Sequence, residues 1–128
     1  MKITDIEGYV LDFPQDPPWG YSKGWVTSAP TLLIEVSTDE GITGWGEAYG
    51  PPEPIHELIQ NLSGPNVTGA DPFETEKIWG MLRHEIRDHS QSGIAMAAIS
   101  AIDIACWDIK GKALNTPVCK LLGGPVHE

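Results

Sequence analysis

The hydrophobic period of the chain changes near residue 50, and this change limits the folds open to it. Before residue 50, apolar side chains recur at every second position, as where Leu32, Ile34 and Val36 alternate with polar residues, which is the pattern of a strand with one buried face. After residue 50 they recur at every third or fourth position, as in an α-helix. Strands that precede helices, rather than alternating with them, predict an α+β fold.

The first part of the chain predicts a three-stranded antiparallel sheet, over residues 2–13, 31–38 and 42–49. Gly8 marks an expected bulge in the first strand. Gly41 lies at the left-handed position expected of a hairpin turn. Gly44 and Gly46 fall on one face of the third strand, and such small residues indicate that another element packs closely there.

The second part predicts helices that begin at Pro54, at Asp71, at residue 93 and at Pro117. Gly64 and Pro65 should end the first of these helices. The second should open with Asp71 as its N-cap and Glu74 closing a capping box. The third, residues 93–113, is apolar almost all round, so we expect it to be buried on most sides.

The chain has 128 residues, so we expect one domain, residues 1–128. A folded chain of this size buries about two thirds of the surface of its unfolded form, which is enough for a core. A complete (β/α)₈ barrel needs about 250 residues and is excluded.

The net charge of −10 disfavours nucleic acid and anionic membrane surfaces as partners, because like charges repel. No apolar run approaches the length that spans a bilayer, and Asp5 falls where a signal peptide would need apolar residues. Cys106 and Cys119 lack zinc-like neighbours, so we expect reduced thiols and a cytoplasmic protein.

Residues 14–30 stand out as an expected loop of 17 residues with four prolines and two glycines, which is long for a compact domain. The segment carries Trp19, Tyr21 and Trp25, whose rings offer rigid contact area. These aromatics fit either a lid over a ligand or a cap on the domain's own core, and the sequence leaves both open.

Some residues come close to known catalytic or metal-binding patterns but do not match them. His84 and His89 lie five residues apart, so on a helix they do not face one metal ion. Asp103 lies in the most apolar helix, and we interpret it as a structural carboxylate rather than a general acid or metal ligand. Asp108 and Lys112 should form a surface ion pair. For Glu47 we favour a structural salt bridge over contact with a ligand.

Two helical segments and one strand resemble a known family. Residues 98–112 read AISAIDIACWDIKGK, residues 117–124 read PVCKLLGG, and residues 41–47 read GITGWGE. They closely resemble the N-terminal capping domain of the mandelate racemase/muconate lactonizing enzyme family, in the enolase superfamily. Residues 75–79 and 82–83 also look like its middle helix, most similar to acid-sugar dehydratases and cycloisomerases.

The resemblance implies a domain that covers the mouth of a (β/α)₈ barrel and shapes the substrate pocket with two loops, near residues 14–30 and 49–56. It implies an enzyme that abstracts a proton next to a carboxylate, with Mg²⁺ stabilising the enediolate. The base and the three acidic metal ligands of the family stand on barrel strands that this chain, ending at Glu128, lacks.

We therefore expect no catalytic residue and no bound metal in this chain, and dehydration, cycloisomerisation or epimerisation of a sugar acid only together with a barrel. The substrate contacts that we expect here are Trp19, Tyr21, Lys23, Trp25 and Tyr49. A second hypothesis is a non-catalytic binding or assembly module. It would form a homo-oligomer through the surface that otherwise faces the barrel, because a large apolar patch normally marks an interface.

Overall fold

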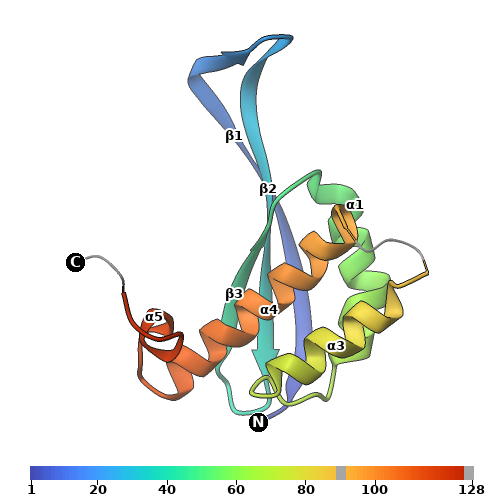
Figure 1. Cartoon of the computed structure of the whole chain (residues 1–128), viewed down its shortest axis with the longest axis vertical. Coiled ribbons are helices and arrows are strands. Elements are labelled where there is room, and N and C mark those ends of the chain that lie inside the picture. The colour runs from blue at the N-terminus through green and yellow to red at the C-terminus, as the bar shows by residue number, and fades with distance from the viewer. Residues whose placement is uncertain (89–91, 126–128) are drawn as a thin grey trace.

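A computed structural model describes residues 1–88 and 92–125 (Figure 1). The elements are β1 (Ile3–Tyr21), β2 (Gly24–Thr38), β3 (Thr43–Ala48), α1 (Pro52–Leu58), the π-helix η1 (Ile59–Ser63), α2 (Gly64–Val67), α3 (Thr75–Glu85), α4 (Ile94–Ala113) and α5 (Val118–Leu121). Strands come first and helices follow, so the α+β prediction is confirmed. The described residues include no barrel.

The three strands form one antiparallel sheet in the order β1-β2-β3. The turn between β2 and β3 is confirmed, since Gly41 has a φ of 77°, which favours glycine. The bulge expected at Gly8 is wrong. Gly8 pairs regularly with Ile34, and the irregularity lies between Ile3 and Asp5. Gly8 is instead small because the ring of His56 occupies the space where a side chain would lie.

The loop expected over residues 14–30 is wrong, because these residues extend β1 and β2 into a long hairpin arm. The arm projects well beyond the body of the molecule (Figure 1). Trp19 pairs with Val26 and Tyr21 with Gly24, after a register shift between Pro14 and Trp19. The prolines are tolerated because a two-stranded ribbon has free edges, where a missing N–H breaks no ladder bond.

The helices cover one face of the sheet, and the core lies between them. α4 crosses β3 (Figure 1), and the close packing predicted from the glycines is confirmed. A Cβ at Gly44 would overlap the carbonyl oxygen of Ala105, and one at Gly46 would overlap that of Ala101. The fully buried large side chains include Leu32, Ile34, Val36, Ile55, Ile59, Leu82, Ile99, Ile102 and Ile109.

Three predicted helix ends are wrong. The first helix begins at Pro52, not Pro54, and it continues through η1 into α2 instead of ending at Gly64. Pro65 lies at the start of α2, directly after the π-helix η1, where the regular bonding of an α-helix is already interrupted. α3 begins at Thr75 after Glu74, without a side-chain cap. Asp71 instead accepts a bond from the N–H of Phe73, which forms a turn before the helix.

A polar clamp joins α4 to β3, and it contains the ion pair predicted between Asp108 and Lys112. Their atoms Oδ2 and Nζ lie 2.7 Å apart. The same Asp108 oxygen accepts a 2.8 Å bond from the backbone N–H of Trp45. Lys112 also donates to the carbonyl of Thr43 at 2.8 Å. The pair therefore holds the edge strand against the helix.

Candidate functional site

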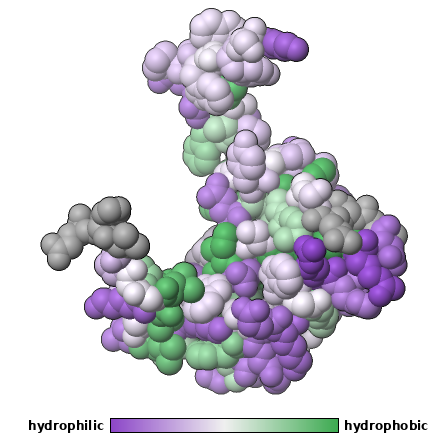
Figure 2. Space-filling view, viewed as in Figure 1, coloured by the Kyte–Doolittle hydropathy of each residue, from purple (hydrophilic) through white to green (hydrophobic). Residues whose placement is uncertain are grey.

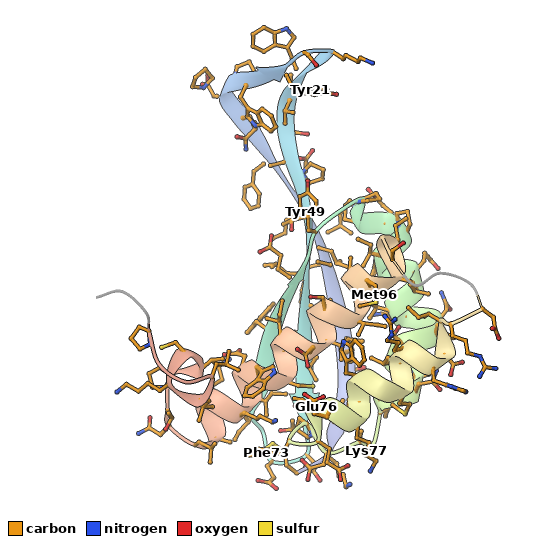
Figure 3. The ribbon with its side chains drawn as sticks, viewed as in Figure 1. Tyr21, Tyr49, Phe73, Glu76, Lys77 and Met96 are labelled. Carbon is orange, nitrogen blue, oxygen red and sulfur yellow. The ribbon has the colours of Figure 1, made fainter. Side chains whose placement is uncertain are left out.

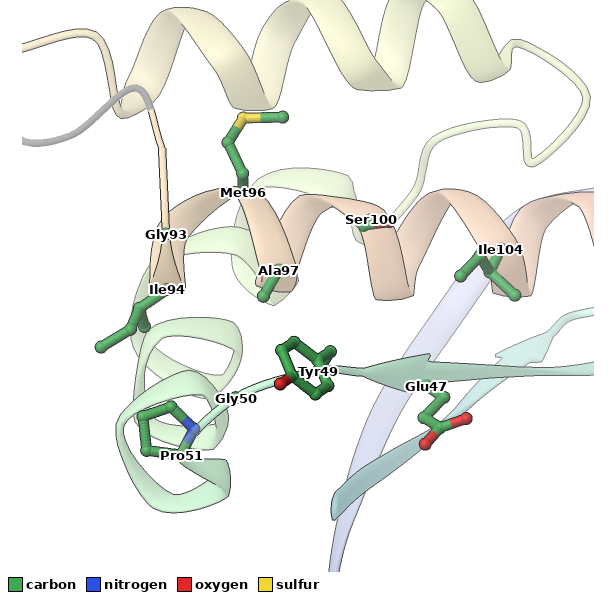
Figure 4. Close-up of a pocket in the computed structure, with 10 residues that line it drawn as sticks. All are labelled: Glu47, Tyr49, Gly50, Pro51, Gly93, Ile94, Met96, Ala97, Ser100 and Ile104. Carbon is green, nitrogen blue, oxygen red and sulfur yellow. The ribbon is translucent and has the colours of Figure 1, made fainter. Parts of the chain in front are cut away.

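Two hollows meet where the arm joins the body. One, of about 610 Å³, lies at the base of the arm. The other, of about 830 Å³, runs between the end of β3 and the start of α4 (Figure 4). Glu47, Tyr49 and Gly50 line both of them. We call the two hollows together the arm-base site.

The backbone after β3 places Tyr49 at the centre of the arm-base site. β3 ends at Ala48, which is buried. Gly50 then turns the chain toward α1 with a φ of 133°, a conformation that L side chains rarely adopt. Tyr49 is left 95% exposed, and Figure 4 shows it facing the stretch of α4 that carries Ala97 and Ser100. Its ring is therefore free to contact a ligand.

Glu47 is the acidic group of the arm-base site. Its Oε1 accepts a 2.8 Å hydrogen bond from the hydroxyl of Thr31 on β2. The salt bridge that we favoured for Glu47 is wrong within residues 1–88 and 92–125, where it has no cationic partner. The reason is positional, since Glu47 lies on the sheet face away from the helices that carry most of the lysines and arginines.

The remaining walls of the arm-base site are mostly apolar and come from α4: Ile94, Met96, Ala97 and Ile104, with the hydroxyl of Ser100 among them. Ile94 and Ile104 are more than 40% exposed. Figure 2 shows apolar side chains along the body below the arm and around α5. The sequence signal was the apolar character of the whole helix, which predicted a covered surface but not these positions.

The structure brings together two of the five expected substrate contacts. Trp19 and Tyr49 both line the hollow at the base of the arm. Tyr21, Lys23 and Trp25 lie at the tip of the arm, outside both hollows, and Figure 3 shows Tyr21 far above Tyr49. A role in substrate binding stays a prediction for all five.

The structure distinguishes between the two interpretations of residues 14–30, a lid over a ligand and a cap on the domain's own core. The rings of Trp19, Tyr21 and Trp25 are 56%, 61% and 73% exposed, so they do not cap the domain's own core, and that alternative is wrong. The ring of Trp25 lies against Gly20 and that of Tyr21 against Gly24, across the strand pair. These contacts stiffen the ribbon, because each ring covers a backbone that has no side chain of its own.

Two titratable groups with raised pKa values, the partly buried Asp103 and the buried Cys106, lie in α4, away from the arm-base site. Burial raises the pKa of Asp103, Glu76 raises it further, and Lys110 lowers it. Asp103 makes no hydrogen bond or ion pair to a described residue, so the bonds expected of a structural carboxylate are not found there. Burial, with the charge of Asp103, raises the pKa of the Cys106 thiol to about 12. Cys119, in contrast, is exposed.

Within the described part of the chain, no three His, Cys, Asp or Glu side chains come together in a way that could hold a metal ion. The pair of His84 and His89 is not tested, because His89 lies outside the described residues. No described helix has the length and apolar character needed to cross a membrane.

Residues 6–123 match the family model for the N-terminal domain of mandelate racemase and muconate lactonizing enzyme. The chain belongs to this family. This match confirms the resemblance to the enolase-superfamily N-terminal domain. The fold class is confirmed as well, because an N-succinyl Arg/Lys racemase from Bacillus cereus superposes on this chain with a TM-score of 0.89 at 36% identity. That match covers 100% of this chain and 35% of the racemase chain.

Curated relatives of this mandelate racemase family domain include sugar-acid enzymes. A D-galactarolactone cycloisomerase from Agrobacterium fabrum is 40% identical over the whole chain, which covers 34% of that protein. A D-galactonate dehydratase from Xanthomonas axonopodis pv. citri is 43% identical, again over the whole chain and 29% of the relative. The chain thus spans about a third of the length of the relatives it matches.

Proposed function

We propose that this chain is the substrate-specificity domain of a Mg²⁺-dependent enzyme that abstracts a proton next to the carboxylate of a sugar acid or related carboxylate. The domain would cap a barrel that holds the chemistry, and would not catalyse by itself. The observation that carries the proposal is the arm-base site, where an exposed Tyr49 and Glu47 meet apolar walls in a domain whose relatives are named for sugar-acid reactions.

The residues of the arm-base site have the chemistry that a sugar acid needs away from its reacting end. The Glu47 carboxylate has acceptor capacity left beyond its bond from Thr31, so it can accept bonds from sugar hydroxyls. Tyr49 and Trp19 offer flat apolar faces, and such surfaces pack against the C–H faces of a sugar. These groups would set the position and length of the substrate, not its reactivity.

We assign the reacting carboxylate of the substrate and the metal ion to the barrel, not to the arm-base site. Mg²⁺ prefers several oxygen ligands in near-octahedral geometry, and Glu47 is the one carboxylate that lines the two hollows. The described residues therefore do not fit a magnesium site, and we derive no step through the ion here. We further propose a cytoplasmic location, in which thiols such as Cys106 and Cys119 stay reduced.

A fusion experiment tests the proposal. The chain replaces the matching N-terminal third of the Agrobacterium cycloisomerase, and turnover of D-galactarolactone is measured with Mg²⁺ for the fusion, for the barrel alone and for this chain alone. We expect turnover from the fusion at least about tenfold above that of the barrel alone, because the cap completes the pocket, and none from this chain. Turnover by this chain alone, over a panel of sugar acids, would refute the proposal.

Variants of the fusion test the named residues. Tyr49→Ala and Trp19→Ala should raise KM about fivefold to tenfold and change the ranking of substrates, with a smaller effect on kcat, because contacts remote from the reacting bond act mainly through binding. Trp79→Ala is the matched control, since Trp79 is an exposed ring on α3 outside both hollows. Equal effects of all three substitutions would contradict the assignment.

A further inference from the structure

The polar lining of the arm-base site is acidic or neutral. Among the described residues, Glu47 is the one charged side chain that lines it. The other lining side chains that can form hydrogen bonds are neutral: Gln15, Trp19, Ser28, Thr31, Tyr49 and Ser100. No lysine, arginine or histidine of residues 1–88 and 92–125 lines either hollow. These residues therefore offer no cation that could balance a negative charge on the bound part of a ligand.

Arg83 contacts a lining residue, but it does so from the α3 side of α4. Its guanidinium lies 5.3 Å from the centre of the Trp79 ring, and its Nη1 lies 3.8 Å from the sulfur of Met96. Figure 4 shows Met96 pointing toward α3, while Ala97 points toward Tyr49. Arg83 is therefore directed away from the hollows, and Glu47 sets the sign of the charge in the arm-base site.

A hydrogen bond holds the Glu47 carboxylate in place as an acceptor. Its Oε1 accepts the proton of the Thr31 hydroxyl at 2.8 Å, and its second oxygen remains able to accept another bond. An ionised carboxylate has no proton to donate, so the ligand group that suits it is a donor such as a hydroxyl. A carboxylate on the ligand cannot donate and has the same charge. Cover by a barrel would strengthen this repulsion, because less water then screens the two charges.

We propose that the arm-base site takes the uncharged, hydroxyl-bearing end of a monocarboxylic sugar acid and rejects sugar acids that carry a carboxylate at both ends. This assignment rests on the proposed function, in which the barrel binds the reacting carboxylate. Trp19 and Tyr49 contact the carbon skeleton that both kinds of acid share, so these rings do not discriminate. Glu47 discriminates, because it accepts a hydrogen bond from a terminal hydroxyl and repels a terminal carboxylate.

D-galactonate and galactarate are a matched pair of ligands for testing this selectivity. They share the configuration of every stereocentre and differ at one end, which is a hydroxymethyl group in galactonate and a carboxylate in galactarate. Each is measured as an inhibitor of D-galactarolactone turnover by the cycloisomerase fusion with Mg²⁺, so neither acid has to react. We expect the inhibition constant of galactarate to be at least about tenfold higher than that of galactonate, because like charges at close range are strongly unfavourable.

Charge variants of the fusion assign the selectivity to Glu47. Glu47→Gln should bring the two inhibition constants to within about threefold of each other, and Glu47→Lys should make galactarate the tighter inhibitor. Glu47 is exposed, and a glutamine there can still accept the bond from Thr31, so the fold should be kept. Glu85→Gln is the control of equal charge change, because Glu85 is an exposed residue of α3 outside both hollows. It should leave the ratio of the two constants unchanged.

The outcomes separate this proposal from the proposed function. A fusion without turnover overturns the proposed function, and the selectivity falls with it. An active fusion that galactonate and galactarate inhibit equally, or that galactarate inhibits more strongly, overturns the selectivity alone. An active fusion whose preference for galactonate is unchanged by Glu47→Gln also overturns it, because the barrel would then discriminate between the two acids.

Discussion

Adding one methyl group at Gly46 is the sharpest perturbation of this fold. A Cβ at this position would overlap the carbonyl carbon and oxygen of Ala101 and would crowd the backbone nitrogen of Ala105. All these atoms belong to the backbone of α4, so no side chain can rotate away. The helix must move about an ångström from β3, or the strand must leave the sheet.

The expected loss follows from that displacement. A gap of about 0.5–1 Å forfeits a quarter to a half of the dispersion energy of each contact across it. α4 carries fully buried residues such as Ile99, Ile102 and Ile109, so much of the helix–sheet contact is affected. We expect Gly46→Ala to lower the free energy of unfolding by about 3 kcal/mol, at the upper end for overpacked cores and a large share of the roughly 5–15 kcal/mol of a typical domain.

Urea unfolding followed by circular dichroism measures this loss. With a slope of about 1.5 kcal/mol per molar urea, the midpoint should fall by about 2 M. Gly80→Ala is the matched control, because Gly80 lies inside α3 and a Cβ there meets nothing within 4 Å. That variant should be about 0.5–1 kcal/mol more stable, as alanine is the better helix former. If Gly46→Ala is as stable as the parent, the close packing of α4 on β3 is refuted.

Three further predictions concern other sites. Gly8→Ala should lower the free energy of unfolding by only about 1 kcal/mol, because the obstacle is the flexible ring of His56. In a His56→Ala background, urea unfolding should show almost no loss of stability from the same substitution. An equal loss in both backgrounds would contradict this explanation. The pKa of Tyr9 is raised to about 12, first by its hydrogen bond to Glu7. Because this value lies above the ordinary value of about 10, its contribution to stability is full below about pH 10 and is lost as the pH rises through about 12. Ultraviolet titration should therefore show one late phenolate that Tyr9→Phe removes, and a full titration near pH 10 would contradict it. A thiol reagent should modify the exposed Cys119 but not the buried Cys106 in the native chain, and both after unfolding; two reactive thiols in the native chain would show that α4 opens.

Much of the body could be predicted from the sequence because its residues obey local rules. Burial on one face produces the period of two in the half of the sheet that meets the helices, and the period of 3.6 in the helices. Gly44 and Gly46 predicted close packing because a missing side chain along one strand face leaves room only for another backbone. The hydrophobic periods also predicted the order of strands and helices and the long buried α4 correctly.

The arm and the arm-base site could not be predicted in this way. The ribbon that carries Trp19 and Trp25 is exposed on both faces, so burial imposes no alternation, and its prolines and glycines read as a loop. The hollows arise where β3, the arm and α4 meet, and no local pattern records such a meeting of distant segments.

What the sequence alone determined is therefore the set of elements and the face that each of them buries, because both depend on neighbours a few residues away. Only the tertiary structure decided that Trp19 and Tyr49 share a hollow while Lys23 stands at a distant tip. The physical reason is that hydrogen bonding between strands can extend a ribbon into solvent without any apolar burial, and such pairing leaves no hydrophobic period in the sequence.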